Sequence, residues 1–294
     1  MKDGFFRVSA VTPKIRVADP VYNREEICKL ISEGHSQGVG LMVFPELCLT
    51  GYTCGDLFLQ DALIEGARGE LGKIVSYTKG LNMIVFVGLP WMHRGKLYNV
   101  AGAICDGRLL GVVPKINLPN YSEFYERRHF TPGNQIPEMT KWQDGEVPMG
   151  TNLLFACKEH PELVIASELC EDVWVPCPPS IRHMLAGATV IANCSASDEV
   201  VGKDSYRREL ISGQPAFSVH MSMQMQERES RLRISYSAVT ISLRRMERSL
   251  RSRSDSGRVQ STQILTLSVS APSAERQRPA RHRIRPDIRR LSFL

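Results

Sequence analysis

The strongest constraint on the fold is a set of three apolar, β-type runs, each of which ends in one reactive side chain. The runs are LMVFPELCLTGY with Glu46, GVVPKINLPNYSEFYERRHF with Lys115, and LVIASELCEDVW with Cys170. The ends of neighbouring strands meet at one edge of a sheet. We therefore expect a base, a cation and a thiol that are 69 and 55 positions apart to share one pocket.

These three side chains suit nucleophilic attack on an acyl carbon. A thiol with a pKa of about 8.5 is only slightly ionised at neutral pH, so Cys170 needs a base such as Glu46 to accept its proton. The Lys115 ammonium and the backbone N–H that follows Cys170 would stabilise the oxyanion of the tetrahedral intermediate. Taken singly, each residue also fits a structural role, because a cysteine in an apolar run is commonly a small buried hydrophobe and charged residues commonly lie at strand ends.

The order of the motifs carries a resemblance to a known family. P-E-x-x-x-T-G-Y, P-K-x-x-L and L-C-E-D-x-W resemble the glutamate, lysine and cysteine signatures of the nitrilase (carbon–nitrogen hydrolase) superfamily. The flanking segments GYTCGDLF, KINLPNYSEFYERRHFTPG and CEDVWVPCPPS are similar to the glutaminase domain of the glutamine-dependent NAD synthetase family, over roughly residues 5–214. The resemblance implies an α/β fold in which two sheets stack into an α-β-β-α sandwich, and a homo-oligomer.

The resemblance also implies a role for each matching residue. Glu46 is the general base, Lys115 stabilises the oxyanion and Cys170 is the nucleophile. Glu126 is the second glutamate, which orients the lysine. The residues that would hold the L-glutamine substrate are Tyr121, Glu171, Ser197 and Lys203. Family members often have arginine where this chain has Lys203, and each of these four residues also fits an ordinary packing or loop role.

The implied reaction is hydrolysis of the side-chain amide of L-glutamine to glutamate and ammonia, through a cysteine thioester and without a cofactor. In the resembling family the ammonia passes to a synthetase domain that uses ATP, magnesium and deamido-NAD. We expect that domain to be missing, because the sequence contains no Ser-Gly-Gly-type pyrophosphate loop. A free-standing aliphatic amidase, a nitrilase-like hydrolase and a catalytically inactive truncated remnant remain as alternatives.

Local patterns around the motifs favour alternating strands and helices. Apolar residues at helical spacing predict helices over about 21–37 and 61–79, and a further helix over 179–186. The dipeptide Asp106-Gly107 predicts a tight hairpin between two strands. This rhythm is typical of a sheet covered by helices.

Length and composition limit the remaining possibilities. The 294 residues, 43% of them hydrophobic, fit one domain of about 200–250 residues followed by a tail. The sequence has neither a signal peptide pattern nor an apolar run near the ~18 residues of a membrane span, so we expect a cytoplasmic protein without a membrane partner. None of the 8 cysteines forms a CxxC pair, and we predict no metal.

The composition changes after Gln214. Residues 215–294 contain 16 Arg and no Lys against 6 Asp and Glu, whereas residues 1–214 carry a net charge of −4. An Arg/Ser arm of this kind can bind nucleic acid. However, residues 215–252 can be back-translated so that another reading frame encodes a family-like continuation. We therefore predict that 1–214 is an incomplete hydrolase domain, that 215–294 is a disordered frameshift product, and that there is no nucleic-acid partner.

Overall fold

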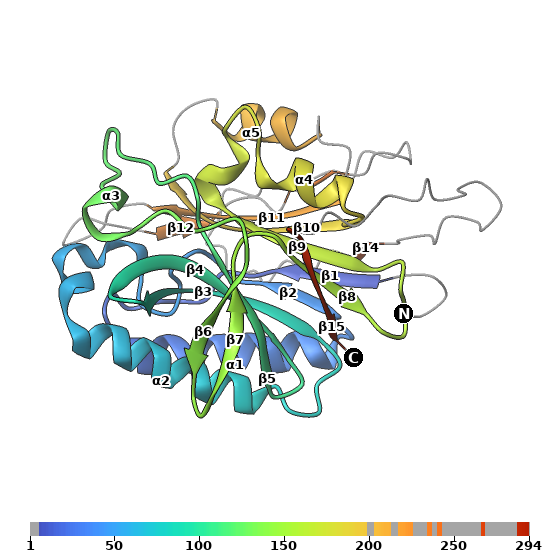
Figure 1. The fold of residues 1–294 in the computed structure, drawn as a ribbon, viewed down its shortest axis with the longest axis horizontal. Coiled ribbons are helices and arrows are strands. Elements are labelled where there is room, and N and C mark those ends of the chain that lie inside the picture. Colours follow the sequence, from blue (N-terminus) through green and yellow to red (C-terminus); the bar gives the residue numbers. More distant parts are fainter. Residues whose placement is uncertain are drawn as a thin grey trace.

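The chain folds into two stacked β-sheets, and helices cover the outer face of each sheet (Figure 1). The structure is a computed structural model that describes residues 6–198, 203–212, 217–225, 234–236, 240–242, 266–267 and 287–293. This α-β-β-α arrangement confirms the fold that the sequence resemblance predicts.

The first sheet has the strand order β14-β1-β2-β3-β4-β5-β7-β6. Strands β1 to β3 run parallel to one another, and β3, β4 and β5 are antiparallel neighbours. The predicted hairpin joins β4 to β5, and its two turn residues Asp106 and Gly107 have φ of 47° and 68°, as a tight two-residue turn requires. The strands are β1 (Phe6–Ala10), β2 (Leu41–Val43), β3 (Ile84–His93), β4 (Lys96–Cys105), β5 (Arg108–Pro114), β6 (Glu138–Trp142), β7 (Gly145–Met149) and β14 (Thr266–Leu267).

The second sheet has the strand order β12-β11-β10-β9-β8-β15, and β13 also pairs with β11. Strands β9, β10 and β11 are parallel, as are β8 and β15. The strands are β8 (Leu153–Cys157), β9 (Val164–Leu169), β10 (Val190–Asp198), β11 (Phe217–Met225), β12 (Ile234–Tyr236), β13 (Thr240–Ser242) and β15 (Arg289–Phe293).

Three helices confirm the predicted ones to within a few residues, and a fourth, Lys203–Ser212, has no counterpart among the predicted helices. Helices α1 (Pro20–Ser36) and α2 (Asp61–Tyr77) lie against the first sheet, and α4 (Pro179–Leu185) and α5 (Lys203–Ser212) lie against the second (Figure 1). Helix α1 begins at Pro20 because Asp19 caps it, accepting a hydrogen bond of 3.0 Å from the backbone N–H of Tyr22. Three short elements, η1 (Tyr52–Leu59), α3 (Glu126–His129) and η2 (Cys170–Val173), lie in the loops.

Strand β3 illustrates how the layers pack. Val85 and Val87 point into the core under helices α1 and α2, whereas Ile84 and Phe86 point into the core between the two sheets. All four side chains are completely buried. Because both faces of the strand are covered, its sequence is a continuous apolar run rather than an alternation of apolar and polar residues.

The described part of residues 215–294 contains strands β11 to β15, which belong to the two sheets. Strand β11 extends the second sheet beside β10, and β15 pairs with β8 at the opposite edge. An open sheet edge can pair with such segments because the hydrogen bonds between strands use backbone N–H and C=O groups. Every residue supplies both groups except proline, which lacks the N–H. The remaining residues of the tail lie outside the described residues, and the frameshift remains a prediction.

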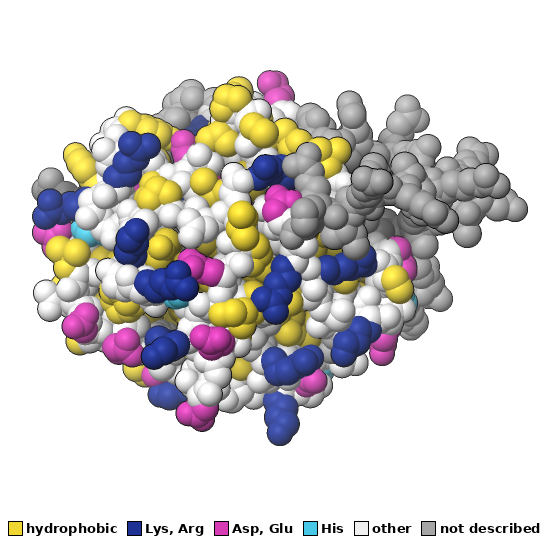
Figure 2. Space-filling model, viewed as in Figure 1, with side chains coloured by type: hydrophobic (Ala, Val, Ile, Leu, Met, Phe, Trp, Pro, Cys, Tyr) yellow, Lys and Arg dark blue, Asp and Glu magenta, His cyan; other side chains and the backbone are white. Residues whose placement is uncertain are grey.

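The surface of the described residues carries charges of both signs. On the face in Figure 2, basic and acidic side chains are interspersed among apolar ones. Among the helices that the structure describes, none is both long and apolar enough to cross a membrane.

Candidate active site

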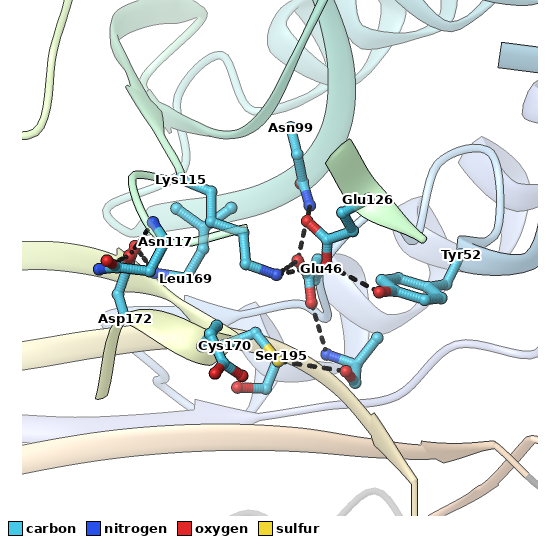
Figure 3. Close-up of polar contacts among 12 residues, drawn as sticks. Glu46, Tyr52, Asn99, Lys115, Asn117, Glu126, Leu169, Cys170, Asp172 and Ser195 are labelled. Carbon is cyan, nitrogen blue, oxygen red and sulfur yellow. Dashed lines mark hydrogen bonds and ion pairs between the residues drawn. The ribbon is translucent and has the colours of Figure 1, made fainter. Parts of the chain in front are cut away.

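Three strand ends place the candidate catalytic side chains together (Figure 3). Lys115 directly follows β5, Cys170 directly follows β9, and Glu46 lies in the loop three residues after β2. Glu46 and Lys115 are completely buried, and Cys170 is 6% exposed. The structure thus brings together the three residues that the sequence motifs single out.

Lys115 sits between two carboxylates. Its Nζ lies 2.6 Å from Glu46 Oε1 and 2.5 Å from Glu126 Oε1. Asn99 Nδ2 donates to both glutamates, at 2.6 Å to Glu46 and 3.3 Å to Glu126, and the Tyr52 hydroxyl donates to Glu126 Oε1 at 2.7 Å. Charges this deeply buried persist only when they are paired and hydrogen-bonded, as they are in this cluster.

The cluster has a marked effect on protonation. Burial raises the pKa of Glu46 to about 7, although the neighbouring Lys115 lowers it. Burial alone would lower the pKa of Lys115, but the carboxylates of Glu126 and Glu46 raise it well above its usual value. At neutral pH the lysine is therefore a fixed cation, whereas Glu46 can take up or release a proton, as a general base must.

The candidate nucleophile occupies a constrained turn. Cys170 has φ of 39°, in the left-handed region, and its N–H donates to Asn193 Oδ1 at 3.2 Å. Its Sγ donates to the Ala196 carbonyl at 3.2 Å, and the N–H of the same alanine donates to Glu46 Oε2 at 3.1 Å. One residue thus contacts both the thiol and the carboxylate, which places the base beside the nucleophile.

The Cys170 thiol is neutral at rest. Burial, together with the carboxylate of Glu46, raises its pKa well above the usual value, although Lys115 opposes this shift. A neutral thiol is a weak nucleophile, so the site requires a base that removes the proton during attack.

A glycine fixes the position of the Glu46 loop. Gly88 on β3 lies so close to this loop that an added Cβ would be 2.3 Å from the Pro45 carbonyl oxygen and 2.4 Å from the Leu47 backbone nitrogen. The Leu49 N–H donates to the Gly88 carbonyl at 3.1 Å. This close approach of two backbone segments requires a residue without a side chain at position 88.

Of the four residues expected to hold substrate, Tyr121 and Glu171 contact each other. The Tyr121 hydroxyl donates to Glu171 Oε2 at 3.0 Å, and the tyrosine is 54% exposed. Glu171 directly follows Cys170 in the sequence, so this pair lies next to the nucleophile.

The other two expected substrate residues lie on the second sheet and on α5. Ser197 is buried near the end of β10, one residue after Ala196. Lys203 is the first residue of α5, and its Nζ lies 5.7 Å from the centroid of the Trp174 ring and 6.0 Å from that of Phe124.

Sequence reasoning missed several polar residues of the site, namely Tyr52, Asn99, Asn117, Asp172 and Asn193. Two of them, Tyr52 and Asp172, belong to the T-G-Y and C-E-D motifs, where a polar group within six positions of a candidate catalytic residue was a usable signal. Asn99 and Asn193 are buried amides that follow apolar residues in their strands, a pattern that by itself indicates a polar partner in the interior.

The donor set does not suggest a metal centre. In the described ranges, no group of three or more His, Cys, Asp and Glu side chains is arranged to hold a metal ion. The charged groups of the site are paired with one another instead.

Known proteins with similar sequences and folds identify the family of this chain. The carbon–nitrogen hydrolase family profile matches residues 7–226. The glutamine-dependent NAD(+) synthetase of Mycobacterium tuberculosis is 42% identical over 207 residues, which are 70% of this chain and 30% of that protein. The crystal structure of a glutamine-dependent NAD(+) synthetase from Cytophaga hutchinsonii is similar with a TM-score of 0.66 and 29% identity, over 74% of this chain and 36% of that chain.

A shorter protein shares the fold. An amidase from Nesterenkonia sp. superposes with a TM-score of 0.59 and 18% identity, over 80% of this chain and 81% of that chain. This chain therefore spans about four fifths of that amidase but only about a third of the NAD synthetases that it matches. From the family match over most of its length and the sandwich fold, the chain belongs to the carbon–nitrogen hydrolase family.

Proposed function

We propose that this chain hydrolyses the side-chain amide of L-glutamine to glutamate and ammonia, with Cys170 as the nucleophile. The observation that carries the proposal is the buried cluster of Glu46, Lys115 and Glu126 beside the Cys170 thiol. The choice of glutamine is supported by the relatives, which are named glutamine-dependent NAD(+) synthetases.

The first half of the reaction forms a thioester. Glu46 takes the proton from Cys170 Sγ as the sulfur attacks the amide carbon, and the carbonyl oxygen becomes an oxyanion. Lys115 and the backbone N–H that follows Cys170 stabilise this oxyanion. The C–N bond then breaks, and the nitrogen leaves as ammonia after taking the proton from Glu46.

The second half returns the enzyme to its resting state. Glu46 removes a proton from a water molecule, which attacks the thioester carbon. The C–S bond breaks, the sulfur of Cys170 recovers a proton from Glu46, and glutamate leaves. The two halves therefore use the same base twice, and the overall reaction consumes only one water molecule.

The surroundings of the site fit a zwitterionic substrate better than a simple amide. Glu171, with the Tyr121 hydroxyl beside it, supplies a negative group for the α-ammonium of glutamine. Lys203 supplies a positive group for its α-carboxylate, and the Ser197 hydroxyl, one residue after Ala196 on β10, is the fourth group proposed to hold the substrate. A simple aliphatic amide has neither charge and could use neither of these charged groups.

The role of the ammonia follows from the relatives. We propose that the chain corresponds to the ammonia-supplying half of a glutamine-dependent NAD synthetase, whose other half would use ATP, magnesium and deamido-NAD. A homo-oligomeric state and a cytoplasmic location remain part of the same proposal.

The proposal is tested with a substrate panel. Purified protein is mixed with L-glutamine, with uncharged aliphatic amides and with nitriles, and ammonia release is measured. We expect glutamine to have the highest kcat/KM. A preference for uncharged amides would identify a free-standing amidase, a preference for nitriles a nitrilase-like hydrolase, and no release from any of them an inactive remnant.

A further inference from the structure

One buried carboxylate near the site has no part in the reaction described above. Asp172, in the turn η2, is completely buried. Its Oδ1 accepts hydrogen bonds of 2.8 Å from both the backbone N–H and the side-chain Nδ2 of Asn117, and its Oδ2 accepts one of 3.2 Å from the backbone N–H of Leu169.

These hydrogen bonds join the two segments between which the reaction would take place. Asn117 lies two residues after Lys115, and Leu169 directly precedes Cys170. Figure 3 shows Asn117 and Asp172 on one side of Lys115, with Glu46 and Glu126 on the other. Glu46 and Glu126 thus hold the Lys115 ammonium, and Asp172 holds the backbone segment that follows the lysine.

A purely local role does not account for this arrangement. A residue that only capped the η2 turn would need the bond to Leu169 alone, whereas two of the three bonds reach a segment 55 positions away. Removing a carboxylate from water is costly unless strong donors replace the water, so a buried Asp at this position needs the full set of three.

We propose that Asp172 is a positioning residue that sets the placement of Lys115 relative to Cys170, and so aligns the oxyanion donor with the nucleophile. The inference rests on the proposed function, because it assigns a part in the same reaction. A displacement of about 1 Å between a nucleophile and its oxyanion donor can cost about 100-fold in rate. Removing the hydrogen bonds of Asp172 should therefore lower turnover more than substrate binding.

The test is a double-variant cycle in the full chain. Asn117→Ala removes the side-chain bond and leaves the backbone N–H bond, Asp172→Ala removes all three bonds, and a third protein combines both changes. We expect Asp172→Ala to lower kcat for glutamine by about 10- to 100-fold with KM changed less than about threefold. Asn117→Ala has a smaller effect, and the combined variant is no worse than Asp172→Ala alone, because no bond to residue 172 is left to lose.

Controls separate positioning from unfolding. The kcat values are normalised to the fraction of protein that a glutamine-like electrophile labels at Cys170, and thermal melting is measured for each variant. Asp144→Ala, on an exposed turn, is the matched control and should keep full activity.

Three outcomes overturn the inference. They are an unchanged kcat in Asp172→Ala, a loss confined to KM, and effects of the two changes that multiply instead of saturating. Each of these leaves the proposed function standing, since the wild-type chain would still release ammonia from glutamine. A wild-type chain without that activity would instead sink the proposed function, and this inference with it.

Discussion

At the scale of single residues, the burial of Lys115 between two carboxylates separates the proposed roles of Lys115 and Glu46. The lysine is held as a cation by Glu46 and Glu126, so it cannot act as the base. Glu46, whose pKa burial raises to about 7, can exchange a proton with the thiol. Lys115 Nζ and Glu46 Oε1 lie 2.6 Å apart, yet in the proposed reaction the lysine stabilises the oxyanion and the glutamate transfers protons.

Replacing Lys115 tests its assignment as the oxyanion donor. Lys115→Met keeps much of the buried volume and removes the charge, so we expect kcat to fall by about 10²–10³ with a smaller change in KM. Steady-state kinetics with glutamine measures both constants. If the whole loss lay in KM, the lysine would instead bind the substrate carboxylate.

The protonation of Glu46 gives a prediction about pH. The base works in its ionised form, and its pKa is raised by burial to about 7. The rate should therefore be low in acid, rise with pH through about 7 and then level off. A profile of kcat/KM between pH 5 and 8.5 measures this, with thermal melting at each pH to confirm folding. A rate that is constant over this range would mean that another group is the base.

The sequence predicts the main side chains of the site but not their partners. Glu46, Lys115 and Cys170 stand in recognisable motifs, and each follows a strand end. Asn193 holds the Cys170 backbone only because β9 and β10 are neighbours with Glu168 opposite Asn193. Such a contact depends on strand order and register, which a local pattern does not determine.

At the scale of elements, the long pieces are predictable and the short ones are not. Helices α1 and α2 have apolar faces of several turns, whereas α3 has four residues and too few positions to show a period. The 3₁₀ element η1 was also missed, although it carries Tyr52 to Glu126. These short elements are held by tertiary contacts rather than by local preference.

Strand β3 acts on the site through Gly88. Gly88→Ala would drive a methyl group into the backbone on either side of Glu46, so we expect the loop to move and kcat to fall by at least tenfold. The matched control is Gly66→Ala on α2, where an added Cβ meets nothing within 4 Å. Ammonia release and thermal melting are compared for the two variants. Full activity in Gly88→Ala would show that the position of Glu46 does not depend on this contact.

At the scale of the whole molecule, the sandwich is held by buried apolar cores, whereas the described strands of the tail are attached mainly by backbone pairing. The cores on both sides of β3, and the separate core that packs on β8 to β10, are built from residues 6–198 except for the edge contributions of Ile288, Leu291 and Phe293. The strands after Gln214 join edges of these sheets through backbone pairing. The sequence predicts the sandwich through its motifs, but it cannot predict edge pairing by a segment that lacks a matching pattern.

The frameshift hypothesis makes the whole-molecule prediction. One base inserted or deleted near codon 214 should replace the arginine-rich tail by family-like strands, and the resulting protein should melt at a higher temperature. The reason is that losing the buried apolar area of a strand costs a free energy comparable with the roughly 5–15 kcal/mol that stabilises a whole domain. Sequencing of the coding DNA and thermal melting of both proteins measure this. The hypothesis fails if no family-like frame lies downstream.

The central claim is that Cys170 performs covalent catalysis on a glutamine amide. It is tested most directly by intact-mass and peptide mapping after treatment with an electrophilic glutamine analogue, on the wild type, on Cys170→Ala and on the control Cys177→Ala, whose side chain is exposed. We predict a single adduct on Cys170 in the wild type and in Cys177→Ala, with parallel loss of ammonia release, and no adduct in Cys170→Ala. An adduct on any other cysteine, or ammonia release that survives in Cys170→Ala, would contradict the claim.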